Sequence, residues 1–374
     1  MDIIYLDNAA TTSLDETVLE AMIPYMTTKF GNPSSIYSYG RDSRLAIENS
    51  RKKVASILNA SPKEIFFNSG GTESNNAAIF SAIRDLQCTH IITSPIEHHA
   101  VLNTVEHYKQ TGLVTTSFVK LLPDGHVDLA DLEAQLKVTR HKCLVTLMHA
   151  NNEIGNLLDI QAVGNICKVY SAIFHSDCVQ TVGHYPINLQ DIYVHFITAS
   201  GHKFHGPKGT GILYINKDIS IKPFIFGGGQ ERNMRAGTEN LYGIVGFAKA
   251  LELSMENLGK DAVYISSLKF YMKSLLEHIP GVSFNGDVSG NSLYTVLNAT
   301  FPASKKTEML LFNLDQLGIC VSGGSACGGG GAGGSHVINA LQNSNKGSTI
   351  RFSFSKFSSK EQVDEVVSKL KELM

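Results

Sequence analysis

The stretch Ile65-Phe-Phe-Asn-Ser-Gly-Gly-Thr-Glu-Ser-Asn75 contains the pattern on which the fold prediction rests. A short run of bulky apolar residues ends in two glycines, and a helix-like segment follows. An apolar run of this length is typical of a buried strand. A Thr72 followed by Glu73 is typical of a helix N-terminus. The stretch therefore predicts a strand, a tight turn and a helix in succession.

The same alternation continues on both sides of this stretch. Six further apolar runs predict strands at residues 91–94, 115–120, 143–148, 173–176, 196–200 and 211–215. Amphipathic segments between and after them predict helices at residues 42–58, 72–86, 100–111, 129–136, 159–170, 238–258 and 262–278. Alternating strands and helices predict an α/β fold with a mainly parallel sheet that helices cover on both faces.

The pattern changes after Pro280. Strand-like segments at 293–301, 319–321 and 349–355 alternate there with helical segments at 308–317 and 360–373. At about 150 residues per domain, a chain of 374 residues has room for two to three domains. We expect a large domain over residues 13–260. A smaller α+β domain would comprise residues 1–12 and 261–374, with a mobile loop at 321–335 and the seam near 259–264.

The composition excludes several classes of protein. Hydrophobic residues make up 43% of the chain and charged residues 18%, which is unlike a disordered protein. The 32 Lys and Arg residues nearly balance the 34 Asp and Glu residues, which argues against a general nucleic-acid-binding protein. No apolar run approaches the roughly 20 residues of a membrane span, and the first 13 residues lack a secretory pattern. We therefore expect a cytoplasmic protein that binds neither nucleic acid nor membrane.

The glycines of the opening stretch indicate a ligand site. Gly70 and Gly71 allow the backbone to approach a ligand closely. Together with the N–H groups and the dipole at the start of the following helix, they favour an anion such as phosphate. The alternative is an ordinary helix N-terminus that Thr72 caps.

Three further polar residues follow predicted strands. Asp177 and His98 each lie just beyond a predicted strand, where ligands of open α/β sheets collect. A histidine ring at such a place can stack on a planar group. Lys203 follows another strand in a turn rich in Gly and His, where desolvation would lower its pKa and make the amine a nucleophile. The alternatives are a helix cap for Asp177, a helix-capping or core histidine for His98, and a solvated loop lysine for Lys203. His202 and His205 have no third ligand nearby, so we expect no metal site.

A glycine-rich loop lies near the end of the chain. Eight of the 33 glycines fall between Gly323 and Gly334, around Cys327. The G-x-G-x-x-G pattern that starts at Gly328 lacks the acidic residue that a dinucleotide site requires about 20 residues later. We interpret the segment as a mobile loop that carries the Cys327 thiol. A plain linker with an inert cysteine is the alternative.

Arg351 lies in the middle of an alternating strand pattern and needs an anionic partner. A substrate carboxylate would suit the guanidinium, and a structural ion pair is the alternative. The joint occurrence of a phosphate site, an acid, a stackable histidine and a loop lysine along one sheet is more informative than any one of them. This set of groups can hold pyridoxal phosphate.

These motifs give the chain a family resemblance that covers nearly its whole length. It resembles cysteine desulfurases of the class V aminotransferase family, of the nitrogen-fixation and iron–sulfur cluster type. The matching segments are Tyr5-Leu-Asp-Asn-Ala-Ala-Thr-Thr12, Gly31-Asn-Pro-Ser-Ser35, Gly70-Gly-Thr-Glu-Ser-Asn75, Asn151-Asn-Glu-Ile-Gly155, His202-Lys203, Gly227-Gly-Gly-Gln-Glu-Arg232, Arg235-Ala-Gly-Thr-Glu-Asn240 and Ser325-Ala-Cys327.

The resemblance implies the fold type I of pyridoxal-phosphate enzymes and a role for each matching residue. Lys203 would bind pyridoxal 5'-phosphate as a Schiff base, Asp177 would hold its ring nitrogen protonated, and His98 would stack on the ring and move protons. Arg351 would clamp the carboxylate of L-cysteine. Gln180 and Asn152 would reach the phenolic oxygen, and Asn152 also the substrate. The phosphate would be bound by Gly71, Thr72, Ser200, His202 and, from the neighbouring subunit of a homodimer, Thr238.

The resemblance also implies the reaction. Cys327 would take the sulfur of L-cysteine as a persulfide, L-alanine would leave, and a sulfur-acceptor protein would receive the sulfur for iron–sulfur cluster or other thio-cofactor synthesis. The glycines from Gly328 to Gly334 replace the mixed loop of the related enzymes, which bears on acceptor choice. The alternatives are another pyridoxal-phosphate lyase or aminotransferase, such as a selenocysteine lyase, and a sulfur-trafficking protein of weak activity.

Overall fold

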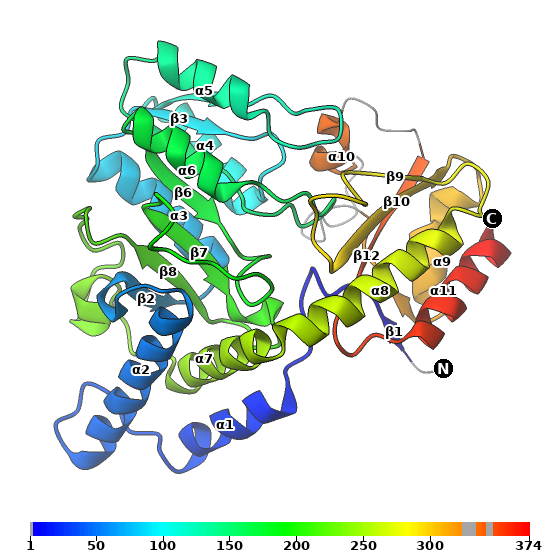
Figure 1. Ribbon diagram of the computed structural model, residues 1–374. Coiled ribbons are helices and arrows are strands. Elements are labelled where there is room, and N and C mark those ends of the chain that lie inside the picture. The colour runs from blue at the N-terminus through cyan, green and yellow to red at the C-terminus, as the bar shows by residue number, and fades with distance from the viewer. Residues whose placement is uncertain (1–2, 324–333, 342–346) are drawn as a thin grey trace.

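The computed structural model describes residues 3–323, 334–341 and 347–374. Within them, a seven-stranded sheet has the strand order β2-β8-β7-β6-β5-β3-β4 (Figure 1). Its strands are β2 Ile65–Asn68, β3 His90–Thr93, β4 Thr115–Phe118, β5 Cys143–Thr146, β6 Ile173–Asp177, β7 Phe196–Ser200 and β8 Gly211–Ile215. Each strand that the sequence predicts in this region is present, and the α/β class is confirmed.

The sheet is mainly parallel, with one strand in the opposite direction. β8 pairs antiparallel with both β7 and β2, whereas β3, β4, β5, β6 and β7 pair in parallel. Residues 201–210, which join β7 to β8, are too few for the crossover that a parallel pair needs. A tight return is the available connection, and it reverses β8.

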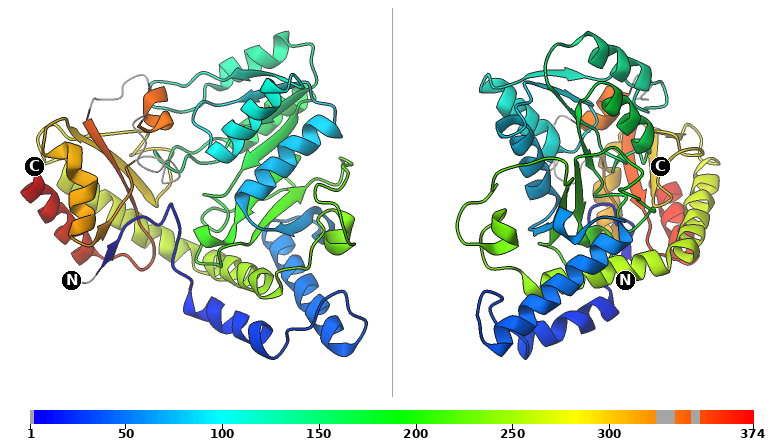
Figure 2. Two further views of the ribbon diagram at one scale, coloured as in Figure 1. Left: turned by 180° about the vertical axis from the view of Figure 1, so that it is seen from behind. Right: turned by 60° about the vertical axis from the view of Figure 1, so that its left-hand side comes forward.

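Helices cover both faces of this sheet. They are α1 Glu16–Thr27, α2 Ser38–Ile57, α3 Gly71–Arg84, α4 His99–Gln110, α5 Leu129–Val138, α6 Ile160–Val169 and α7 Leu241–Glu256. Along β2, Phe66 packs in the core beneath α3 and α4, while Ile65 and Phe67 pack in the opposite core beneath α2 and α7. This alternation is the period of two that a strand buried on both faces shows. The rear view in Figure 2 brings α3 and α4 to the front, opposite α6.

The rest of the chain forms a second apolar core around a three-stranded sheet of order β12-β10-β9. Its elements are β1 Ile4–Tyr5, α8 Leu258–Leu276, β9 Ser283–Phe284, β10 Val296–Pro302, α9 Leu310–Gln316, β11 Ile319–Cys320, α10 His336–Ala340, β12 Gly347–Ser353 and α11 Lys360–Leu373. Figure 1 shows α7 and α8 nearly end to end below the two sheets. The predicted seam at 259–264 falls in the first turns of α8, and the predicted domain bounds stay a prediction.

Among the described residues, no helix combines the length and the apolar character that crossing a membrane requires.

Candidate active site

Several strands of the large sheet end at one edge. The strand register places Asn68 of β2 opposite Gly211, Gly211 opposite Ser200 of β7, and Thr198 opposite Asp177 of β6. A cavity of about 250 Å³ lies at this edge. The predicted site residues that line it are Gly71, Thr72, His98, Asn152, Asp177, Gln180, Ser200, His202, Lys203 and Arg351.

One end of the cavity is built to receive an anion. Gly70 has a φ of +143°, and α3 begins directly after it at Gly71. A Cβ on Gly71 would lie 2.7 Å from Cγ2 of Val179, so only glycine allows the helix start to sit this close to the neighbouring turn. The first N–H groups of a helix have no partners within the helix and attract negative charge. Gly70 is the N-cap residue and has no side chain with which to cap the helix, so the alternative of a Thr72 cap does not hold.

Ser200 and His202 lie at the same end. A Cβ on Gly70 would approach Oγ of Ser200 to 3.5 Å. The Nδ1 atom of His202 lies 3.1 Å from the Thr11 hydroxyl oxygen. Burial, and to a lesser degree Lys203 and Lys208, lower the pKa of His202 to about 4. A neutral imidazole and a hydroxyl can donate hydrogen bonds to a phosphate beside the helix N-terminus.

Lys203 lies in the 3₁₀ turn Gly201–Lys203 that follows β7. Its Nζ donates hydrogen bonds to the carbonyl oxygens of Ala9 and Ala10, each at 2.7 Å. The N-terminal segment is fixed there because the Thr12 amide donates to the His202 carbonyl oxygen at 2.9 Å. Lys203 is therefore a partly buried amine at the cavity wall, which excludes the alternative of a solvated loop lysine.

Asp177 supplies a buried carboxylate at the end of β6. It is 5% exposed, and its oxygens accept hydrogen bonds from the Val179 amide at 2.9 Å and from Nδ2 of Asn75 at 2.6 Å. Both donors are neutral, so neither of these hydrogen bonds brings a positive charge to the carboxylate. Such a carboxylate favours a cationic N–H group beside it. Asn75 also lines the cavity, and within the described residues its Oδ1 is buried without a hydrogen-bond partner.

His98 both caps a helix and lines the cavity. Its Nδ1 accepts a hydrogen bond from the Ala100 amide at 3.1 Å, at the start of α4. Burial lowers the pKa of His98, although Asp177 opposes that shift. The neutral ring consequently carries its proton on Nε2. The helix-capping alternative is thus correct, and it is compatible with a ring at the cavity wall.

Arg351 lies on β12, opposite Asn298 of β10, and is 1% exposed. Its Nη2 donates to Oδ1 of Asp7 at 2.6 Å, and its Nη1 donates to the Asn152 carbonyl oxygen at 2.9 Å. The ion pair that the sequence left as an alternative is therefore present. The Nε atom of Arg351 is buried and has no hydrogen-bond partner in the described part of the chain. Because Arg351 also lines the cavity, it has an N–H group to offer a carboxylate.

Among the described site residues, Thr238 is the one that does not line this cavity. Thr238 lines a separate cavity together with Ser69 and Arg235. Cys327 lies outside the described residues. Gln180 is in the main cavity, where its amide donates to the Ala9 carbonyl oxygen at 3.1 Å.

The sequence reasoning missed the partners of its own candidates. Asn75 donates a hydrogen bond to Asp177, and Asp7 accepts one from Arg351. The carbonyl oxygens of Ala9 and Ala10 accept hydrogen bonds from Lys203. All four residues lie in segments already singled out, 5–12 and 70–75. What the sequence did not reveal was which side chains these segments meet.

No group of three or more His, Cys, Asp and Glu side chains within the described ranges is arranged to hold a metal ion. The donor set fits pyridoxal phosphate instead, because an amine, a buried carboxylate, an aromatic ring and an anion-binding helix start line one cavity. The orphaned Oδ1 of Asn75 and Nε of Arg351 leave polar contacts open for a bound molecule.

Comparison with known proteins agrees with this geometry. Residues 4–366 match the family described as "Aminotransferase class-V". The chain is 42% identical to the "Cysteine desulfurase IscS" of Dictyoglomus turgidum over 99% of this chain and 94% of the relative. A solved "NIFS-LIKE PROTEIN" superposes with a TM-score of 0.91 at 37% identity, covering 100% of this chain and 99% of the other. A structure titled "SspA in complex with cysteine" has a TM-score of 0.82 at 30% identity over 95% of this chain and 100% of the other. The chain therefore belongs to the class-V aminotransferase family.

Proposed function

We propose that this protein is a pyridoxal-phosphate-dependent cysteine desulfurase, which removes sulfur from L-cysteine and releases L-alanine. The observation that carries the proposal is the single cavity that brings together Lys203, Asp177, His98 and Arg351. Relatives named cysteine desulfurase, at about 40% identity along the whole chain, support it.

The cofactor would be held along the cavity wall. The start of α3 at Gly71 and Thr72, with Ser200 and His202, would bind the phosphate. Asp177 would hold a proton on the ring nitrogen, and Lys203 would attach the cofactor covalently. His98 would cover the ring, while Gln180 and Asn152 would contact its oxygen. When bound, pyridoxal phosphate supplies an electron sink for negative charge at the substrate Cα atom.

The chain's own residues would then carry out the remaining work. Arg351 would orient the cysteine carboxylate through charge-assisted hydrogen bonds. The Lys203 amine, once displaced by substrate, would move the Cα proton. The Cys327 thiolate would attack the substrate sulfur, so that an S–S bond forms and the Cβ–S bond breaks. Reprotonation of the carbon skeleton gives L-alanine, and the persulfide passes to a sulfur-acceptor protein for iron–sulfur cluster or other thio-cofactor synthesis.

The assembly would be a homodimer. Apolar side chains are exposed on α1 and on the segment that follows it, including Ile23 at 46%, Phe30 at 68% and Ile36 at 87%. An exposed group of this kind is typical of an interaction surface. Thr238, which lies outside its own chain's main cavity, would reach the phosphate of the partner's site.

A substrate panel tests this proposal. The purified protein, loaded with pyridoxal phosphate, is given L-cysteine, L-selenocysteine, or L-alanine with a keto acid, and the products are measured. Alanine and sulfide from L-cysteine support a desulfurase. Activity confined to selenocysteine, or amino-group transfer to the keto acid, would replace it with a lyase or an aminotransferase. A yellow protein without any turnover would favour a sulfur-trafficking role.

A further inference from the structure

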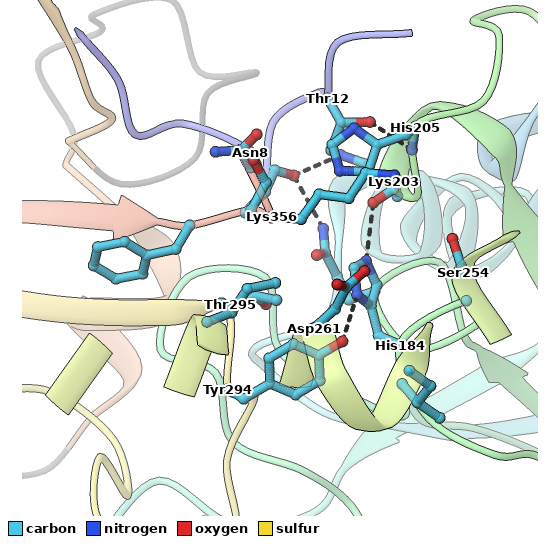
Figure 3. Close-up of a pocket in the computed structure, with 17 residues that line it drawn as sticks. Asn8, Thr12, His184, Lys203, His205, Ser254, Asp261, Tyr294, Thr295 and Lys356 are labelled. Carbon is cyan, nitrogen blue, oxygen red and sulfur yellow. Dashed lines mark hydrogen bonds between the residues drawn. The ribbon is translucent and has the colours of Figure 1, made fainter. Parts of the chain in front are cut away.

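A second, smaller cavity lies behind Lys203. It has a volume of about 30 Å³, and Figure 3 shows its polar lining. The lining comes from the N-terminal segment, from the turn after β6, from α8 and from residues 294–295 before β10. Lys203 lines both this cavity and the main one, so it lies in the wall between them.

A chain of two hydrogen bonds crosses this region. Nε2 of His184 lies 2.9 Å from the Lys203 carbonyl oxygen, and Nδ1 of His184 lies 3.0 Å from the Tyr294 hydroxyl (Figure 3). A carbonyl oxygen only accepts, so Nε2 must carry the proton. Nδ1 of the neutral ring is then an acceptor, and the Tyr294 hydroxyl must donate to it. Burial lowers the pKa of His184, which agrees with a neutral ring.

A glycine brings His184 within reach of Lys203. Gly183 has a φ of +82°, and a Cβ added to it would lie 2.7 Å from Cβ of Phe204. The turn that follows Asp177 therefore packs directly against the turn that carries Lys203. A larger residue at position 183 would separate the two turns and break the contact between His184 and the lysine backbone.

Tyr294 connects this contact to the strands that hold Arg351. The Tyr294 amide donates a hydrogen bond to the Tyr185 hydroxyl at 3.2 Å. The carbonyl oxygen of the next residue, Thr295, accepts one from the Phe354 amide at 2.8 Å. β10 then begins at Val296 and pairs with β12, which carries Arg351. The hydrogen-bond chain thus runs from the backbone of the lysine to the strand pair that bears the arginine.

We propose that His184 and Tyr294 are positioning residues, which hold the Lys203 backbone at a fixed place relative to β10 and β12. This inference rests on the proposed function, since it concerns the distance between the lysine amine and the arginine that orients the substrate. Without the two hydrogen bonds, the Gly201–Lys203 turn keeps its place in the sheet and its contacts with residues 9–12, but it loses the link through Tyr294 to β10. The amine then spends less time where it meets the cofactor and the Cα proton.

Polar and charged groups from several elements surround the His184 ring. Asp261 of α8 and the backbone of Lys203 act on its ring, and His205 of the neighbouring turn lies within electrostatic range. The ring forms hydrogen bonds with the Tyr294 hydroxyl and the Lys203 carbonyl oxygen, and neither partner is a carboxylate. A test of the inference must therefore remove the hydrogen bonds that join Tyr294, His184 and the Lys203 carbonyl oxygen.

Three substitutions test the inference. Tyr294→Phe removes one hydroxyl, His184→Leu removes the donor to Lys203, and His184→Gln retains an N–H group. A net hydrogen bond of about 0.5–1.5 kcal/mol corresponds to a loss of about two- to tenfold. We expect Tyr294→Phe and His184→Leu to lower kcat with L-cysteine by about that factor, with KM nearly unchanged, and His184→Gln to recover most of it. The dissociation constant of pyridoxal phosphate should rise in parallel.

Tyr264→Phe is the matched control, because its hydroxyl donates to the Ser358 carbonyl oxygen and touches none of His184, Tyr294 and Lys203. If the His184 and Tyr294 variants lose thermal stability but match this control in kcat and cofactor affinity, the role is structural and the inference is overturned. The same follows if His184→Leu and His184→Gln behave alike. Should the wild type release no alanine from L-cysteine, the proposed function fails, while cofactor affinity still reports on the positioning of Lys203.

Discussion

Replacement of Asn75 by alanine should weaken both cofactor binding and turnover. Nδ2 of Asn75 donates a 2.6 Å hydrogen bond to Oδ2 of Asp177, and Asn75 is 1% exposed. The deletion removes this donor and leaves the Val179 amide bonded to the buried carboxylate. The buried carboxylate loses a donor that stabilises its charge and fixes its position, so it should hold the ring nitrogen of the cofactor less firmly.

The size of the effect follows from the type of bond. A hydrogen bond to a charged group contributes about 1.5–3 kcal/mol, which corresponds to about a ten- to 150-fold change. The dissociation constant of pyridoxal phosphate, from absorbance titration of the apoprotein, and kcat for alanine release should change by factors in this range. The matched control is Asn76→Ala on the same helix, because Asn76 is exposed and donates to the Thr72 carbonyl oxygen rather than to Asp177. Equal effects of the two variants would refute the reasoning.

Three further predictions concern the anion site, the arginine and pH. In Gly71→Ala, the 2.7 Å contact with Val179 should cost about 1–3 kcal/mol or move the helix N-terminus. The affinity for pyridoxal phosphate should therefore fall in the same absorbance titration. Unchanged affinity would contradict the anion site. Arg351→Lys should raise KM for L-cysteine by about ten- to 100-fold, because lysine lacks the planar donor fork, and a KM within twofold of wild type would exclude a carboxylate contact. Burial lowers the pKa of His149 and His202 to about 4, whereas an unfolded histidine titrates near 6.5. Between these two pKa values the unfolded state binds more protons than the folded state, so the free energy of unfolding should fall as the pH is lowered from 6.5 to 4. Urea titrations at several pH values measure this fall. A free energy of unfolding that does not change with pH would contradict the burial of these rings.

Most of the fold was predictable because its strands are short apolar runs that the sequence isolates clearly. β2, β6 and β7 are predicted to within a residue of their ends. The direction of β8 was not stated, since strand direction depends on the length of the connection rather than on the strand's own residues. α1 was missed because it contains Pro24 and buries only Val18 and Met22, which leaves a weak amphipathic pattern.

The site was predictable to the extent that its residues follow strand ends. Asp177 and Lys203 come directly after apolar runs, and the sheet brings their positions together without further information. The pairing of Asp7 with Arg351 joins residues 344 positions apart, and periodicity carries no information about such a contact. The same holds for His184 and Tyr294, whose contact depends on the packing of two turns around Gly183.

The central claim is that the Cys327 thiol takes the sulfur of L-cysteine. Its most direct test compares alanine and sulfide release, in the presence of a reducing thiol, for the wild type, Cys327→Ala and Cys320→Ala. Cys320 is the matched control, because it is partly exposed and burial raises the pKa of its thiol, which disfavours the reactive thiolate. We predict that alanine release is lost in Cys327→Ala and retained in Cys320→Ala. Unchanged release in Cys327→Ala would contradict the persulfide mechanism.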